Sequence, residues 1–195
     1  MNPPDLLEAL APVAEALESL GVAYYVGGSL ASSAHGVPRA SLDVDLMAEL
    51  RPEHVTSLCQ RLQDAYYLDP DRVGDAVARK RSFNLIHLAT MLKVDVFVSR
   101  GRPFDREALA RVRHERLGDA EAGRLFALVS AEDIVLLKLE WFRLGGETSE
   151  RQWTDVLGVL KVARGALDAA YLDRWAGALG VADLLERART DAGLA

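Results

Sequence analysis

The feature that most constrains this chain is an apolar run that ends abruptly in two glycines and a serine. Residues 22–26 are apolar and β-prone, so we expect a buried strand there. Gly27 and Gly28 at its end allow the backbone to approach a ligand closely, and the N–H groups of a following helix would form an anion site. Ser29 can cap that helix or donate its hydroxyl to a phosphate oxygen. The stretch therefore predicts a strand, a turn and a helix suited to binding phosphate.

Two aspartates follow at a spacing that brings them together. Asp43 and Asp45 alternate with Leu42, Val44 and Leu46, so on a strand both carboxylates lie on one face and the apolar side chains on the other. Adjacent carboxylates repel each other unless a cation lies between them. Mg²⁺ (or Mn²⁺) carrying a nucleoside triphosphate is the natural candidate. The alternative is that the glycines only turn the chain and the aspartates lie on a solvated strand face.

A third carboxylate lies on another expected strand. Residues 92–98 alternate strictly, with Lys93, Asp95 and Phe97 on one face and four apolar residues on the other. Burying a lone carboxylate without a partner costs several kcal/mol, so its presence on so apolar a strand indicates a function for Asp95.

The order of these motifs, Gly-Gly-Ser, a short helix and then Asp-x-Asp, resembles the signature of the nucleotidyltransferase superfamily with the DNA polymerase β-like catalytic fold. In that superfamily a third carboxylate comes from a strand beside the Asp-x-Asp strand, and Asp95 fits that place. The resemblance implies that Asp43 and Asp45 hold two Mg²⁺ ions and that Asp95 shares one and helps to deprotonate the attacking hydroxyl. Gly28 and Ser29 would cradle the β- and γ-phosphates. The implied reaction transfers a nucleoside monophosphate from an NTP to an acceptor and releases pyrophosphate.

The second half of the chain adds a second resemblance. Lys138, on an otherwise apolar helix at residues 131–144, and Asp155, on the next helix, look like the C-terminal motifs of the AbiEii-type toxin nucleotidyltransferases. In that family these two residue types turn towards the nucleotide. The alternatives are that Lys138 extends to the surface and that Asp155 only pairs with Lys138 or Arg151. Arg39 could reach a triphosphate or pair with one of the aspartates of the Asp-x-Asp motif.

The acceptor stays open at this point. The toxin resemblance suggests tRNA or protein as the acceptor, together with a cognate antitoxin as a partner. A small hydroxyl compound such as an aminoglycoside or lincosamide is the alternative, and a catalytically silent nucleotide-binding module is a third possibility that the complete carboxylate set disfavours. The net charge of −6 argues against broad binding of nucleic acid, although residues 79–81 and the arginines within 100–117 form local basic patches. An acidic cleft beyond the metals would favour a cationic antibiotic, and a basic rim would favour RNA.

The composition limits the class of protein to which this chain can belong. Half of the 195 residues are apolar, no run approaches the length of about 20 residues that a membrane span needs, and the N-terminus has no signal-peptide pattern, so we expect a cytoplasmic protein. The single cysteine excludes an internal disulfide and a cysteine-rich zinc site. We expect an α/β (α+β) fold with a mixed sheet flanked by helices. Residues 1–117 would form the nucleotidyltransferase core, and residues 118–195 a helical region packed on it.

The apolar periodicity and the turn residues also predict where the elements lie. Residues 100–117 are expected to be a linker with one short helix, and 125–129 a last strand. Helices are expected at about 4–20, 30–35, 52–64, 71–81, 131–144, 149–164, 167–178 and 181–190.

Overall fold

The computed structural model describes residues 3–41, 43–117 and 124–194 of the chain. By its internal contacts the chain forms two compact units. The first unit consists of Met1–Gly27 and Ala40–Leu128, and the second of Gly28–Arg39 and Val129–Ala195. The predicted division into a nucleotidyltransferase core at residues 1–117 and a helical region at 118–195 packed on it stays a prediction.

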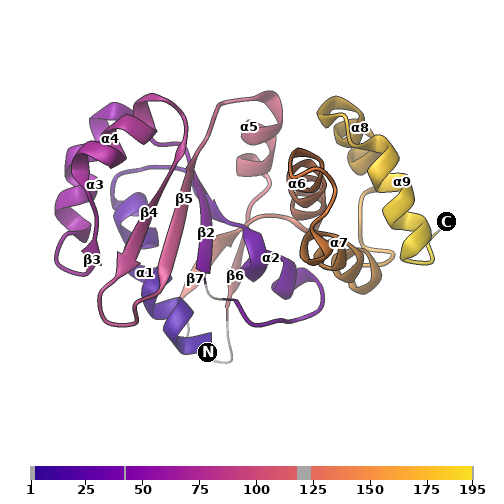
Figure 1. Ribbon diagram of the computed structural model, residues 1–195, viewed down its shortest axis with the longest axis horizontal. Helices are drawn as coiled ribbons and strands as arrows, with labels where there is room; N and C mark the ends of the chain where they lie inside the picture. The colour runs from indigo at the N-terminus through magenta and orange to yellow at the C-terminus, as the bar shows by residue number, and fades with distance from the viewer. Residues whose placement is uncertain (1–2, 42, 118–123, 195) are drawn as a thin grey trace. The chain divides into compact units, whose positions relative to one another are not determined.

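The described strands of the chain all lie in the first unit and form one mixed sheet in the order β3-β4-β5-β2-β1-β7-β6 (Figure 1). Strand β2 runs parallel to β5, and β1 runs parallel to β7, whereas the other neighbouring pairs are antiparallel. The strands are β1 (Tyr24–Val26), β2 (Asp43–Ala48), β3 (Tyr66–Tyr67), β4 (Ser82–His87), β5 (Lys93–Val98), β6 (Arg113–Arg116) and β7 (Leu125–Leu128).

The two faces of the central strands differ in polarity. On β2 and β5 every second side chain is buried and the ones between are half-buried, which follows from the two-residue period of a strand. Helix α1 lies against both strands, and α3 packs on α1. The face that carries Asp43, Asp45 and Asp95 is the half-buried one. The helices of this unit are α1 (Pro3–Ser19), α3 (Val55–Leu62), which follows the single 3₁₀ turn η1 (Pro52–His54), α4 (Pro70–Ala78) and α5 (Pro103–Ala110).

The second unit is helical, and α6 is its centre. Helices α2, α7 and α8 all pack on α6, which explains why most of its side chains are buried. Three helices of this unit begin at a side-chain cap, because Ser130, Ser149 and Asp168 each accept a hydrogen bond from a backbone N–H of the first turn. The elements are α2 (Gly28–His35), α6 (Ala131–Leu144), α7 (Glu150–Val162), α8 (Ala169–Leu179) and α9 (Ala182–Asp191).

The predicted fold class, a mixed sheet with flanking helices, is confirmed. Two local predictions were wrong. Residues 113–116 form the edge strand β6 rather than a linker, and their charged side chains suit an edge exposed to solvent. Helix α4 ends at Ala78, before the basic triplet, because Lys80 adopts a left-handed conformation (φ 53°) and the Arg81 N–H donates to the Ala76 carbonyl. None of the described helices is long and apolar enough to cross a membrane.

Candidate active site

Three carboxylates lie together on the half-buried face of the sheet in the first unit. The parallel register of β2 and β5 places Asp45 directly opposite Asp95, and Asp43 opposite Lys93. The side chains between them, such as Val44 and Val94, are buried on the other face. The geometry expected from the alternating pattern is therefore confirmed for Asp43, Asp45 and Asp95, and their catalytic and metal-binding roles stay predictions.

Lys93 supplies the positive charge at these carboxylates. Its Nζ lies 2.6 Å from Asp95 Oδ2, with 41% of the lysine side chain and 19% of the aspartate side chain exposed. The hydrogen bond to Asp95 raises the pKa of the Lys93 ammonium, partial burial acts in the opposite direction, and the charges of Asp95, Asp43 and Asp45 raise the pKa further. The sequence pattern placed Lys93 on this face but did not reveal its role as a counter-ion.

Two further groups hold the Asp-x-Asp strand in position. Ser41 is 5% exposed, and its hydroxyl lies 3.0 Å from Asp43 Oδ1, so it orients that carboxylate. The Gly27 N–H donates to the Asp45 carbonyl at 2.9 Å, which fixes the end of β1 beside β2. No sequence motif pointed to Ser41, because a serine two residues before an aspartate is common in turns.

The donor set of this cluster fits a divalent metal. Within the described residues, no group of three or more histidine, cysteine, aspartate or glutamate side chains is close enough to enclose an ion. Mg²⁺ does not need such a cage, since it is usually held by one or two carboxylates, several waters and the phosphates of its substrate. Asp43, Asp45 and Asp95 provide hard oxygen ligands, and in this structure the Lys93 ammonium pairs with Asp95.

The second unit contains a cluster in which two cations pair with one carboxylate, Asp155. Both oxygens of Asp155 are paired with cations. Arg39 donates from Nε at 2.8 Å and from a terminal nitrogen at 2.9 Å, and Lys138 donates from Nζ at 2.8 Å. Arg39 also donates to the Ser29 hydroxyl, and Lys138 donates to Gln152 Oε1 at 3.1 Å. The side chains of Asp155, Lys138 and Arg39 are 5%, 6% and 25% exposed.

In this second cluster two cations share the carboxylate of Asp155. Burial alone would raise the pKa of the Asp155 carboxyl, but the hydrogen bonds and charges of Arg39 and Lys138 outweigh burial and hold the pKa below its ordinary value. One carboxylate therefore pairs with two cations at once. One network thus contains four of the residues that the sequence singled out, namely Ser29, Arg39, Lys138 and Asp155. Gln152 is a further member, which the sequence motifs did not reveal.

Helix α2, which carries Ser29, is held closely within the second unit. Gly28 adopts a left-handed conformation (φ 54°), so the turn into α2 needs a glycine at that position. Gly27 does not adopt a left-handed conformation. At the other end of α2, a Cβ on Gly36 would lie 2.8 Å from both the Ser32 carbonyl oxygen and the Val159 nitrogen. This close approach of α2 to α7 brings Arg39 within reach of Asp155.

No protein-family model matches the chain, and no curated protein has significant similarity to it. Several solved structures have the same fold. The solution structure of the antibiotic-resistance factor ANT(2'')-Ia matches with a TM-score of 0.58 and 14% identity, over 97% of this chain and 100% of that one. The crystal structure of ANT(2'')-Ia with adenylyl-2''-tobramycin gives a TM-score of 0.55 and 15% identity, over 89% and 96% of the two chains.

A third match is the crystal structure of an antigenic nucleotidyltransferase-like protein from Paracoccidioides brasiliensis, with a TM-score of 0.60 and 18% identity over 96% of this chain and 92% of that one. At these identities the similarity concerns the fold, which is the one seen in nucleotidyltransferase-like proteins.

Proposed function

We propose that this chain is a metal-dependent nucleotidyltransferase, which transfers a nucleoside monophosphate from an NTP to an acceptor hydroxyl and releases pyrophosphate. The observation that carries the proposal is the carboxylate cluster, in which Asp45 and Asp95 lie opposite each other on adjacent parallel strands and Asp43 lies on the same face. Three carboxylates on one face repel each other unless they hold a cation, so the arrangement is explained best by metal binding. The Gly-Gly-Ser and Asp-x-Asp motifs and the shared fold support the same conclusion.

The three carboxylates have distinct proposed roles. Asp43 and Asp45 would hold Mg²⁺ or Mn²⁺, Asp95 would share an ion with them, and Ser41 would keep Asp43 in its orientation. A bound divalent ion stabilises the negative charge that develops on the phosphoryl oxygens. Asp95 would accept the proton of the acceptor hydroxyl as its oxygen bonds to the α-phosphorus. The bond from the α-phosphorus to the bridging oxygen breaks, and pyrophosphate leaves with the bonding electrons.

The basic cluster of the second unit would bind the phosphates. Gly28 and Ser29 at the start of α2 offer backbone N–H groups and a hydroxyl, and Arg39 and Lys138 offer positive charge. Asp155 would hold both cations in place when no nucleotide is bound. The simplest alternative is that this cluster only stabilises the helical unit.

The identity of the acceptor is the finer part of the proposal. The resemblance to AbiEii-type toxins predicts tRNA or protein as the acceptor and a cognate antitoxin, and these, together with a cytoplasmic location, stay predictions. A small hydroxyl compound is the second candidate, and one observation favours it. ANT(2'')-Ia, which has the same fold, has been crystallised with an adenylylated aminoglycoside.

Calorimetric titration with ATP, GTP, CTP and UTP, with Mg²⁺ and in EDTA, tests the proposed function directly. We expect at least one nucleotide to bind, and to bind much more weakly in EDTA, because the carboxylates repel an NTP that has no metal. Equal affinity in EDTA for every nucleotide would contradict the proposal. Incubation with each α-³²P-labelled NTP and with RNA, protein and small-molecule acceptors then shows what becomes labelled.

The variants Asp43→Asn and Asp45→Asn sharpen this test. Each is expected to lower the rate of transfer by about a thousandfold, which corresponds to the several kcal/mol that a bound metal contributes to the transition state. The fold should stay intact, since removing one of several clustered charges relieves repulsion. Asp183→Asn is the matched control, because Asp183 is an exposed partner of Arg143 in the second unit. Near-normal turnover in either test variant would show that the Asp-x-Asp pair is not the metal site.

A further inference from the structure

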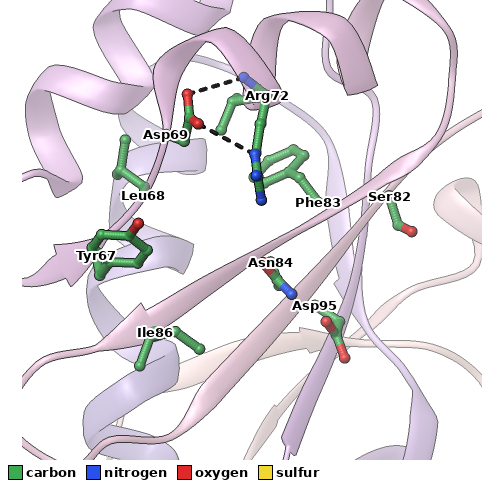
Figure 2. Close-up of a pocket in the computed structure, with 10 residues that line it drawn as sticks. Tyr67, Leu68, Asp69, Arg72, Ser82, Phe83, Asn84, Ile86 and Asp95 are labelled. Atoms are coloured by element: carbon green, nitrogen blue, oxygen red, sulfur yellow. Dashed lines mark hydrogen bonds and ion pairs between the residues drawn. The ribbon is translucent and has the colours of Figure 1, made fainter.

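A cavity of about 310 Å³ opens on the carboxylate face of the sheet in the first unit. Asp95 and Asn84, which lie directly opposite each other on β5 and β4, form one end of it. Tyr67, from the end of β3, lies at the other end, and the ion pair between Asp69 and Arg72 lies above it at the start of α4 (Figure 2). The nucleotide roles proposed above use only Asp95 among the residues that line this cavity.

We infer that this cavity binds the acceptor of the reaction, and that the acceptor is a small hydroxyl-bearing molecule with one or more amines. The inference rests on the proposed function, since it gives Asp95 the task of accepting the acceptor's proton. A general base has to lie within hydrogen-bond reach of the hydroxyl that it deprotonates. The space next to Asp95 is therefore where the acceptor hydroxyl has to lie, and the cavity provides that space.

The polar side chains of the cavity suit a hydroxylated ligand. Ser82 and Asn84 are exposed on β4, and they offer a hydroxyl and an amide that can both donate and accept hydrogen bonds. Tyr67 is 70% exposed, so its ring is available to a sugar-like ring or a cation, and its hydroxyl to a polar group. The volume lies at the lower end of the range of about 300–1,000 Å³ for small-molecule pockets. A compact ligand or one ring of a larger one fits that size.

The charges around the cavity disfavour a polyanion. A second hollow shares Arg72 and Ser82 with the first and continues along α4. Nucleic acid binding depends on cations that are available to phosphates, whereas an amine is attracted by an excess of carboxylates. The charged residues that line the two hollows are the acids Asp69, Asp71, Asp75 and Asp95 and the bases Arg72 and Arg81.

Arg72, one of the two cations that line these hollows, and the nearby Arg79 are engaged by carboxylates. Arg72 lies 3.3 Å from Asp69, and Arg79, the C-cap residue of α4, lies 2.6 Å from Asp75. RNA would have to separate these pairs before its phosphates could use the guanidinium groups. An acidic cleft favours a cationic acceptor, and a basic rim favours RNA. Because four acids and two bases line the two hollows, these residues favour a cationic acceptor.

The test compares three probes on the full chain: tobramycin as a hydroxylated amine, maltotriose as a neutral hydroxylated molecule, and a short single-stranded RNA. Each is titrated in the presence of Mg²⁺ and a non-hydrolysable ATP analogue, by calorimetry and by amide NMR shifts. We expect tobramycin to bind, maltotriose to bind more weakly and RNA to bind least. The shifted amides should include those of Tyr67, Ser82 and Asn84.

Two variants locate the binding site. Asn84→Ala should lower tobramycin affinity about tenfold, the loss of one hydrogen bond, and Asp71→Asn about two- to fivefold, with less effect at high salt. Asp71 is chosen because Asp69 caps α4 and its loss would disturb the helix. Gln60→Ala removes an exposed amide from α3, outside both hollows, and should leave the affinity unchanged.

The outcomes separate this inference from the proposed function. Suppose that Mg²⁺-dependent NTP binding is intact, but tobramycin shifts the amide signals of other residues or binds Asn84→Ala with unchanged affinity. The cavity assignment is then wrong, and the proposed function stands. If RNA shifts the amides of Tyr67, Ser82 and Asn84 and tobramycin does not, the acceptor class is wrong. If no NTP binds with Mg²⁺, the proposed function fails, and the cavity cannot be an acceptor site even if tobramycin binds there.

Discussion

The two charged clusters of this protein are built in opposite ways. The cluster on the sheet of the first unit has three carboxylates and one lysine, and its side chains are half-buried, so negative charge is in excess near solvent. The cluster in the helical unit has one carboxylate that pairs with both Arg39 and Lys138, and Asp155 and Lys138 are buried while Arg39 is half-buried. In the first cluster three carboxylates face one lysine, and in the second two cations share one carboxylate.

Because the two clusters differ in burial, mutations in them should differ in how much they affect the stability of the fold. A half-exposed charge costs little to remove, because water screens it, whereas a buried charge that loses its partner is costly. Changes at the carboxylate cluster should therefore alter metal binding and catalysis with little effect on the fold. Changes at the basic cluster should alter stability and nucleotide binding together. The predictions below test this contrast, in addition to the loss of activity expected for Asp43→Asn and Asp45→Asn.

Replacing Asp155 should have the largest effect on stability. Asp155→Asn removes the carboxylate that pairs with half-buried Arg39 and buried Lys138, and we expect the free energy of unfolding to fall by about 3 kcal/mol. Urea denaturation measures the change. The control is Asp183→Asn, where the exposed carboxylate pairs with Arg143 at 2.7 Å and we expect no measurable change. Equal stability of the two variants would show that burial does not distinguish the clusters.

The pH dependence of the same variant provides a second check. The pKa of Asp155 is lowered in the folded state, so its stabilising contribution is complete above its unfolded pKa of about 3.9 and is lost as the pH falls through the lower folded pKa. The difference in unfolding free energy between the wild type and Asp155→Asn should stay constant above about pH 5 and narrow below about pH 4. A difference that widens in acid would contradict the assigned pairing.

Lys138→Ala tests whether the positive charge of the second cluster serves the nucleotide. It is expected to weaken NTP affinity by about 1–3 kcal/mol, or roughly 5- to 150-fold, the size of a charge-assisted hydrogen bond. Stability should fall less than in Asp155→Asn, because Arg39 still pairs with Asp155. Lys161→Ala, at an exposed position of α7, is the matched control and should bind NTP normally. Unchanged nucleotide affinity, with only the melting temperature altered, would make the cluster purely structural.

Gly36→Ala tests how the basic cluster is assembled. Its Cβ would lie 2.8 Å from backbone atoms of Ser32 and Val159, so α2 would have to move from α7 and carry Arg39 away from Asp155. We expect a loss of about 1–3 kcal/mol in unfolding free energy, as for other overpacked sites. Gly177→Ala, on an exposed turn of α8 with no atom within 4 Å of the new methyl group, should instead be stabilising by up to about 1 kcal/mol. Similar changes in the unfolding free energy of both variants would show that close packing at Gly36 is not the cause of the loss.

Lys93→Met should have the smallest effect. It removes the cation from beside Asp95, and we expect the metal-free protein to lose less than about 1 kcal/mol, because the lysine side chain is 41% exposed. Melting temperatures with and without Mg²⁺ measure this, and Mg²⁺ should restore the variant to the wild-type value. Lys161→Met serves as the control. A deficit that persists in saturating Mg²⁺ would show that Lys93 does more than balance the carboxylates.

Much of the carboxylate cluster could be predicted from the sequence, because its pattern is local. Alternation over a few residues determines which side chains of a strand share a face, so Asp43 and Asp45 were expected on one face and Asp95 opposite the apolar side of its own strand. The α6 boundaries, residues 131–144, followed equally from a serine cap and an apolar run. Strand β6 was missed because a strand of Arg113, His114, Glu115 and Arg116 has no apolar alternation to reveal it.

Only the tertiary structure decided which side chains meet. The register that places Asp45 opposite Asp95 depends on how two strands 50 residues apart in the sequence pair, and the bond between Arg39 and Asp155 spans 116 residues. The cavity beside Asp95 likewise needs β3, β4, β5 and the start of α4 to come together. Local periodicity within a short window carries no information about such distant pairs, because they depend on how elements pack and not on the period of any one of them.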